Sequence, residues 1–451
     1  MKRKNHILYL LLPFLLLGMQ SCKPELKGQT QAPAPGIDFQ KQLDLLIKDP
    51  ILLEEFEIDE QGIRFLPTEE GLAMWQIYPE EYELTRNLLK AKDSEEMLDL
   101  LDEKGSQPWG EYVSKGFSGE RKQTSFHYQD SSDLPLQGLK VALDPGHMAG
   151  NMQIAELEGK YVKMAGSPRS DNEAISFFEA NLNLSTAHVV REELEKLGAE
   201  VFMSRREAGL STQGYEYWDW KEEKWDSTLK ASLKEGVITE EQEVYYRKKA
   251  PEDKIFNHFF VRQDLNNRAR IINNYQPDLT LIIHYNVDAP NWLNRNEEGE
   301  FIPTEENYAM AFVPGSFMKG ELSKGVDRVD FLRLLLSPED IEASVKLSDL
   351  FLRHSLFLTE VPIVEESQDL GYLTNASILA DKKGVYARNL SLSRMIKGPL
   401  VYGESLCQDN AAESLMFNQK DFEIEGIVVS SRVKQIAQAY INATIEYARG
   451  L

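Results

Sequence analysis

Four polar side chains stand where the chain passes from an apolar run, typical of a buried β-strand, into a turn or a helix. The apolar runs cover residues 139–144, 279–283 and 399–403, and the four side chains are His147, Glu179, His284 and Glu404. Because open α/β sheets place their chemistry outside the carboxyl ends of their strands, we expect the four to share one site. Two imidazoles and one carboxylate are the ligand set of a hydrolytic zinc site with an open coordination position. The remaining residue is then free to accept a proton.

Each of the four side chains also has an ordinary structural interpretation. A histidine after a strand has many roles, so both His147 and His284 are compatible with hydrogen-bonded structural positions. Glu179 precedes a helical stretch, where a carboxylate favours the positive end of the helix dipole. Glu404 is either a solvated carboxylate just past the sheet edge or, if desolvated, a group that needs a nearby cation or metal.

Strands and helices alternate in the larger, C-terminal part of the chain. The expected strands lie at 139–144, 199–203, 279–283 and 399–403, and the expected helices at 184–197, 265–272, 338–351 and 433–447. We expect Gly198 to end the first of these helices and Ser337 to cap the third. The alternation predicts an α/β fold, phosphorylase/hydrolase-like, with a mostly parallel twisted sheet and helices on both faces. We assign residues 137–451 to this domain.

Residues 39–136 predict a smaller N-terminal α+β region. Asp38 is placed to cap the first helix, residues 57–66 suggest a hairpin around a glycine, and residues 79–103 return to helical spacing. His127 is the only imidazole of this region, and we interpret it as a surface or core residue. No chemistry is predicted here.

Residues 207–261 interrupt the alternation with a charged insertion that contains Trp218, Trp220 and Trp225. An insertion of this length is usually a lid, an interaction surface or a subdomain, and it is a candidate docking site for a protein activator. The tryptophans either stack on sugar rings or pack the insertion onto the main domain. We expect the second, because tryptophan is usually highly buried.

Bulk composition limits the partners of the protein. The 451 residues are 42% hydrophobic, which is enough for one large or two medium domains with substantial cores. The formal net charge of −23 argues against a nucleic-acid partner, because phosphates require a basic face.

The first residues carry targeting information. A basic start and a short apolar stretch at residues 7–18 predict a signal peptide over residues 1–21. Cys22 follows it as in bacterial lipoproteins, so we expect a lipid anchor there, in the outer membrane and facing the periplasm; an ordinary secreted protein is the alternative. Residues 22–38 are a polar linker. Cys407 is the only other cysteine, so an acylated Cys22 leaves no internal disulfide.

Four segments, taken in order, resemble the zinc-dependent N-acetylmuramoyl-L-alanine amidases with an amidase-3 type catalytic domain. The matching positions are Asp144 to His147, Glu179 with Asn183-Leu184, Arg268 to Asn286, and Pro399 with Glu404 and Asn410. The resemblance spans residues 138–448. The chain departs from the family pattern at Ile282, at Tyr402, at Met148-Ala149 and at Ser405-Leu406-Cys407, and its insertion is far longer.

The resemblance implies that His147, Glu179 and His284 hold Zn²⁺ and that Glu404 is the catalytic proton acceptor. It also implies peptidoglycan as partner and substrate, cut between N-acetylmuramic acid and L-alanine. A catalytically silent wall-binding lipoprotein and a zinc exopeptidase acting on soluble peptides are the alternatives. His188, near the edge of a helix stripe, and His258 and His354, which have no partners at a ligand spacing, are expected to be structural. The thiolate of Cys407 could bind zinc, but we expect a small core residue, because cysteine is usually buried.

Overall fold

The protein is described here from a computed structural model. It describes residues 37–68, 71–110, 126–130, 132–164, 174–288, 295–297, 299–366 and 370–451. The predicted signal peptide, Cys22 and nearly all of the linker lie outside the described residues. Within those ranges, no helix combines the length and the apolar character needed to cross a membrane.

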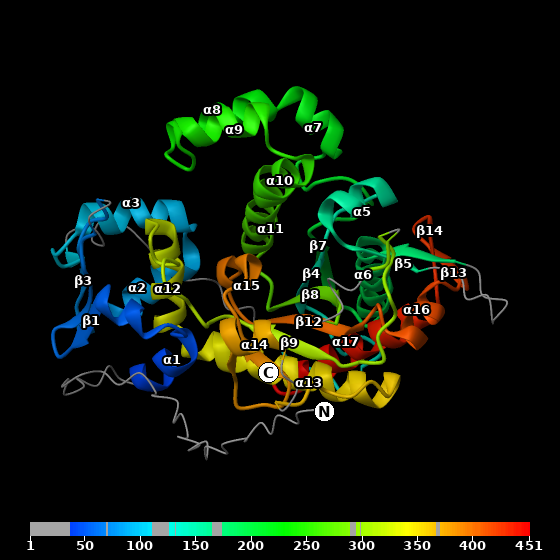
Figure 1. The fold of residues 1–451 in the computed structure, drawn as a ribbon. Helices are drawn as coiled ribbons and strands as arrows, with labels where there is room; N and C mark the ends of the chain where they lie inside the picture. Colours follow the sequence, from blue (N-terminus) through cyan, green and yellow to red (C-terminus); the bar gives the residue numbers. More distant parts are fainter. Residues whose placement is uncertain are drawn as a thin grey trace, which may run out of the picture.

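A mostly parallel sheet runs through the centre of the molecule (Figure 1). Within the described residues it has seven strands in the order β10-β11-β9-β12-β8-β4-β7. The strands are β4 (Lys140–Pro145), β7 (Glu200–Met203), β8 (Leu279–Asn286), β9 (Met310–Val313), β10 (Ile378–Leu379), β11 (Val385–Ala387) and β12 (Leu400–Cys407). Neighbouring strands are parallel except in the pairs β9–β12 and β10–β11. The predicted fold class is confirmed.

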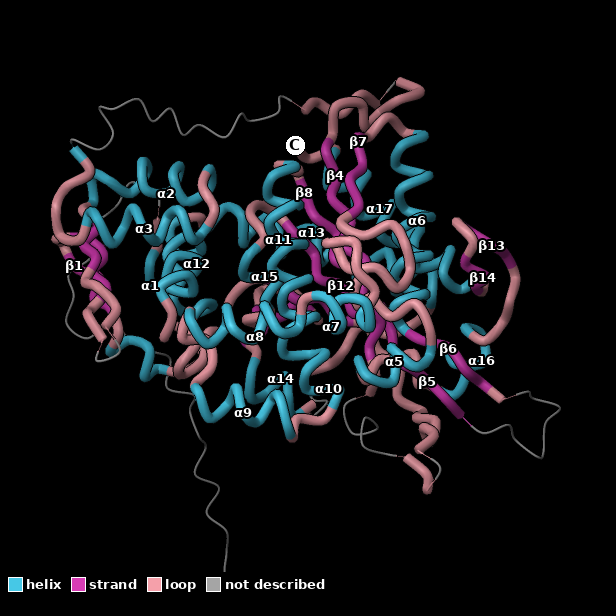
Figure 2. The backbone as a smooth tube through the Cα atoms, turned by 90° about the horizontal axis from the view of Figure 1, so that it is seen from above, coloured by secondary structure: helices cyan, strands magenta, loops and turns pink. Residues whose placement is uncertain are grey.

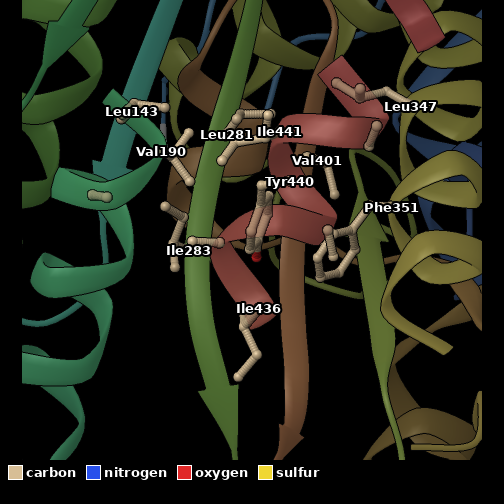
Figure 3. Packing of buried hydrophobic residues seen from close by; sticks show 14 of the residues in the cluster. Leu143, Val190, Leu281, Ile283, Leu347, Phe351, Val401, Ile436, Tyr440 and Ile441 are labelled. Carbon is tan, nitrogen blue, oxygen red and sulfur yellow. The ribbon is translucent and has the colours of Figure 1, made fainter. Parts of the chain in front are cut away.

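Helices cover both faces of this sheet. One face packs against α6 (Glu179–Lys196), α13 (Pro338–Thr359) and α17 (Arg432–Ala448). Figure 3 shows Leu281, Ile283 and Val401 of the sheet against Ile436 and Tyr440 of α17. The opposite face packs against α11 (Arg262–Tyr275) and α15 (Ser391–Met395), and farther along against α14 (Gly371–Ala376). Because side chains alternate along a strand, each strand supplies apolar groups to both layers.

The N-terminal region forms its own apolar cluster. It contains α1 (Phe39–Leu46), β1 (Phe56–Asp59), β2 (Gly62–Phe65), β3 (Trp75–Ile77), α2 (Tyr82–Ala91), α3 (Ser94–Lys104) and two short 3₁₀ turns. The expected hairpin is β1–β2, and the Asp38 side chain accepts a hydrogen bond from the amide of Lys41 as a helix cap. Helix α12 (Gly325–Leu336), which the sequence patterns did not predict, joins this cluster from the C-terminal part of the chain. Both views place it beside α2 and α3 (Figures 1 and 2).

The insertion folds into α7 (Tyr217–Glu223), α8 (Trp225–Lys234), α9 (Glu240–Lys248) and α10 (Glu252–Ile255), followed by a π-helical turn (Phe256–Val261) that continues into α11. Trp220 is buried, as expected, and packs against the ring of Phe260 within the insertion, whereas Trp218 is 42% exposed. The same apolar cluster contains Met148 and Ala149. Two of the departures from the family pattern thus pack against the insertion.

Smaller elements complete the chain around the sheet. They are α5 (Met152–Glu158), β5 (Tyr161–Met164), β6 (Ile175–Phe178), α16 (Ala411–Phe417), β13 (Phe422–Ile424) and β14 (Ile427–Val429). Gly198 has φ +93° just after α6, so the predicted glycine end of that helix is confirmed.

Two local predictions are wrong. The first concerns strand length: His284 and Glu404 lie inside β8 and β12 rather than after them. Parallel pairing continues past the apolar runs, so these polar residues still form ladder hydrogen bonds. The second concerns only the side chain of Ser337. This residue occupies the predicted N-cap position of α13, but its buried hydroxyl makes no capping hydrogen bond within the described part of the chain.

Candidate metal centre and proton acceptor

Three of the predicted site residues meet above the sheet. His147 follows β4, Glu179 is the first residue of α6, and His284 belongs to β8. One ligand atom from each lies within 4.8 Å of the other two. Oε1 of Glu179 is 3.2 Å from Nε2 of His147 and 3.1 Å from Nδ1 of His284. Residues separated by more than a hundred positions thus form one compact group.

The geometry of this group fits a small divalent cation. Ligands about 2.0–2.1 Å from a tetrahedral metal lie about 3.3 Å from one another. The two carboxylate–imidazole distances, 3.2 and 3.1 Å, match that value. Nε2 of His147 is buried, and within the described residues it makes only the ion-pair contact with Oε1 of Glu179, so it faces another candidate ligand rather than a structural hydrogen-bond acceptor. His147, Glu179 and His284 are therefore suited to hold Zn²⁺.

A sharp turn aims His147 at the site. His147 has φ +59°, a left-handed conformation that is uncommon for a non-glycine residue. Gly146 before it passes directly over the second imidazole: a Cβ atom there would lie 2.2 Å from Cε1 and Nε2 of His284. The amide of Gly146 donates to the carbonyl of Ile283 at 3.0 Å, which ties the turn to β8. Only glycine fits this approach.

A buried arginine also fixes this turn through hydrogen bonds. Arg268, on α11, donates to the carbonyl oxygens of Pro145 at 3.0 Å and His147 at 3.1 Å. Its guanidinium also pairs with Asp264 at 2.6 Å and Asp144 at 3.5 Å. Burial lowers the pKa of Arg268, but the two carboxylates outweigh it and raise that pKa above the ordinary value. The Asp-Pro-Gly-His turn is therefore fixed by a charged network rather than by packing alone.

Glu158 is a site residue that the sequence patterns did not single out. Its Oε1 lies 3.1 Å from Nδ1 of His147, and it also accepts from the amide of Met148 at 3.2 Å. A carboxylate on the far nitrogen of an imidazole orients the ring and makes it a stronger ligand. Burial lowers the pKa of His147, but Glu179 and Glu158 outweigh burial and raise that pKa to about 9, so a metal that binds this imidazole would displace a proton. Glu158 ends a short helix, and nothing in its neighbouring residues marks it.

The other two members of the group are prepared for metal binding in different ways. Burial lowers the pKa of His284 to about 4, so this imidazole is neutral at pH 7. Burial would raise the pKa of Glu179, but the charge of His147 outweighs it and holds that pKa well below the usual value. Glu179 also accepts from the amide of Tyr285 at 3.2 Å and from the side chain of Gln408 at 3.0 Å. A neutral imidazole and an ionised carboxylate are the forms that bind a metal.

Glu404 lies next to the group but outside it. It is paired in register with His284 on the adjacent parallel strand and is half-buried. Burial and the negative charge of Glu179 raise the pKa of Glu404 to about 7. Such a carboxyl can accept and release a proton near neutral pH. Tyr402, on the same face of β12, stacks on His284 with ring centroids 4.6 Å apart.

The remaining histidines of the described residues lie elsewhere. His188 is buried and hydrogen-bonds to the carbonyl of Arg206, His258 stacks on Tyr246, His354 contacts Glu446, and His127 is exposed. Cys407 is buried, and burial raises the pKa of its thiol well above the ordinary value, as expected for a core cysteine. A cavity of about 780 Å³ lies between α3, α11, α12 and α15, and none of the four predicted site residues lines it.

The sequence matches no protein-family model and no curated protein. Among solved structures, the chain is similar to the CwlD amidase from Clostridioides difficile in complex with the GerS lipoprotein, with 16% identity, 68% of this chain and 96% of that chain covered, and a TM-score of 0.32. It is similar to the catalytic domain of CwlV, an N-acetylmuramoyl-L-alanine amidase from Bacillus (Paenibacillus) polymyxa var. colistinus, with 14% identity, coverage of 68% and 96%, and a TM-score of 0.32. It is also similar to the N-acetylmuramyl-L-alanine amidase Ami1 from Mycobacterium smegmatis, with 14% identity, coverage of 71% and 100%, and a TM-score of 0.35.

Proposed function

We propose that this protein is a zinc-dependent hydrolase of peptidoglycan that cuts the amide bond between N-acetylmuramic acid and L-alanine. The observation that carries the proposal is the meeting of both imidazoles at Oε1 of Glu179, with Glu404 on the neighbouring strand. Two neutral ligands and one anion with an open position are typical of hydrolytic zinc sites. The peptidoglycan amide bond itself comes from the motif resemblance.

In this mechanism His147, Glu179 and His284 hold the ion, and Glu404 moves the proton. Zinc supplies a Lewis acid that activates water near neutral pH and polarises a carbonyl oxygen. One carboxylate oxygen of Glu404 accepts the proton of the attacking water and then delivers it to the nitrogen of the leaving amine. A pKa of about 7 suits both transfers, because the group loses and regains its proton at little cost.

The test is analysis of the products released from purified sacculi by the zinc-loaded protein and by its Glu404→Gln variant. We expect free stem peptides and bare glycan from the wild type. The variant should keep its zinc and lose about 10²–10⁴-fold in rate, the usual contribution of a general base. Released single amino acids would instead identify an exopeptidase. Zinc binding without any product would identify a silent wall-binding protein.

We also propose that the insertion at residues 207–261 binds a protein activator. The exposed ring of Trp218 and the contact of Met148 with the insertion core support a regulatory role for this segment.

We propose as well that Cys22 carries a lipid anchor and that the domain works at the outer membrane, facing the periplasm. Expression of a Cys22→Ala variant tests the anchor: the protein should move from the membrane fraction to the soluble fraction. Equal membrane retention of both forms would contradict the anchor.

A further inference from the structure

Arg388 lies on the face of the sheet that carries the candidate site. It directly follows β11, whose residues pair in parallel register with β9. Side-chain alternation and strand register place it on the same face as Phe312, Tyr402 and His284. The centre of its guanidinium group lies 5.2 Å from the ring centroid of Phe312 and 5.1 Å from that of Tyr372. Two aromatic rings therefore hold this cation in place.

A continuous row of rings connects this arginine to the metal group. The centroids of Phe312 and Tyr402 are 6.1 Å apart, and Tyr402 stacks on His284 at 4.6 Å. The guanidinium lies over a ring of β9, two strands away from β8. The three steps from the guanidinium to Phe312, from Phe312 to Tyr402 and from Tyr402 to His284 measure 5.2, 6.1 and 4.6 Å, so the guanidinium lies no more than about 16 Å from the imidazole of His284.

The N–H groups of the Arg388 guanidinium are available to a ligand. Within the described residues, the Arg388 side chain has ring contacts but no hydrogen-bond or ion-pair partner, and it is only half-buried. Its positive charge reaches the site, because it lowers the pKa of both Glu404 and Tyr372, although burial raises each of them more strongly. An arginine held by ring contacts keeps its N–H groups free for a ligand, and their fork matches a carboxylate.

We propose that Arg388 binds a carboxylate on the peptide part of the substrate. The proposal rests on the proposed function. An extended peptide advances about 3.3–3.6 Å per residue, so a span of at most about 16 Å places this carboxylate within about five residues of the scissile amide. The row from His284 to Phe312 would lie beneath the intervening peptide. Arg388 would thus set specificity for peptides that carry a free acid at this distance.

The test compares Arg388→Gln, Arg388→Lys and the wild type, all zinc-loaded. Two probes are used: a muramoyl peptide with free peptide carboxylates, and the same compound with those carboxylates converted to amides. Dissociation constants come from calorimetry with the released peptide, and KM and kcat from turnover. Arg353→Gln is the matched control, because that arginine is exposed on α13 behind the opposite face.

We expect the wild type to bind the free-acid peptide about tenfold to a hundredfold more tightly than the amidated one, as for a charged hydrogen bond. Arg388→Gln should lose this discrimination, raise KM for the free acid and leave kcat nearly unchanged, with Arg388→Lys intermediate. Equal affinity of the wild type for both peptides, or full discrimination by Arg388→Gln, would overturn the proposal. Because peptide binding needs no turnover, the result stands whether or not the amide is hydrolysed. Absence of hydrolysis by every form would count against the proposed function alone.

Discussion

His284 and Glu404 are register partners on the adjacent parallel strands β8 and β12. A candidate metal ligand and a candidate proton acceptor are therefore set side by side by backbone hydrogen bonds, not by a flexible loop. Parallel strands lie about 4.8 Å apart, so the two side chains share one local environment. The raised pKa of Glu404 follows from that environment, since burial and Glu179 both disfavour its charged form.

The first prediction concerns the pH dependence of hydrolysis. Glu404 must be ionised to accept a proton, and its pKa is raised from 4.5 to about 7, so activity should fall as the pH drops below about 7. A bound cation favours the ionised form of Glu404 and so lowers its pKa. In the zinc-loaded protein, the pH below which activity falls should therefore lie between 4.5 and 7. The measurement is kcat/KM against pH, with zinc content followed at each point. A rate that stays constant down to pH 4.5 with zinc retained would contradict the role of Glu404.

The second prediction concerns Glu158, which contacts the far nitrogen of His147 at 3.1 Å. Glu158→Gln keeps the shape of the side chain but removes its charge, so His147 becomes a weaker and less firmly oriented ligand. We expect zinc affinity to fall about 10–100-fold, measured by competition with a chelating dye. Glu156→Gln, at an exposed position on the same helix, is the control and should bind zinc as the wild type does.

The third prediction concerns the close approach of Gly146 to His284. In Gly146→Ala, the added Cβ would overlap the imidazole at 2.2 Å, so one of the two has to move. A displaced ligand should lower zinc affinity by about tenfold or more, comparable to the loss of a supporting partner. Gly110→Ala adds the same atom in open space and serves as the control. Unchanged zinc affinity in Gly146→Ala would mean that the turn adapts without disturbing the site.

The fourth prediction concerns stability. Arg268→Gln leaves the buried carboxylates of Asp264 and Asp144 without their cation and frees the carbonyl groups of the turn. Removing one partner of a buried ion pair lowers the free energy of unfolding by about 3–5 kcal/mol. The measurement is urea denaturation of the variant and the wild type. Arg270→Gln, exposed on the same helix, should change stability by less than about 0.5 kcal/mol. A similarly small effect for Arg268→Gln would show that the network contributes little.

Local patterns in the sequence predicted much of the fold. Apolar runs and helical spacing located β4, β7, β8, β12, α6, α11, α13 and α17, with errors of up to eight residues at their ends. Asp38 and Gly198 were recognised as helix ends because capping depends on adjacent backbone. Helix α12 was missed, since it is buried almost all round and so lacks an amphipathic stripe. It packs against a region more than two hundred residues earlier in the chain.

The candidate site could also be predicted only in part. The sequence by itself determined which residue types are present and in what order, because His147, Glu179, His284 and Glu404 stand in motifs of neighbouring residues. Only the tertiary structure decided that three of them meet at one oxygen, that Glu158 supports one of them, and that Arg388 reaches the same face. Strand order and helix packing make these contacts, and they depend on burial across the whole chain rather than on neighbouring residues.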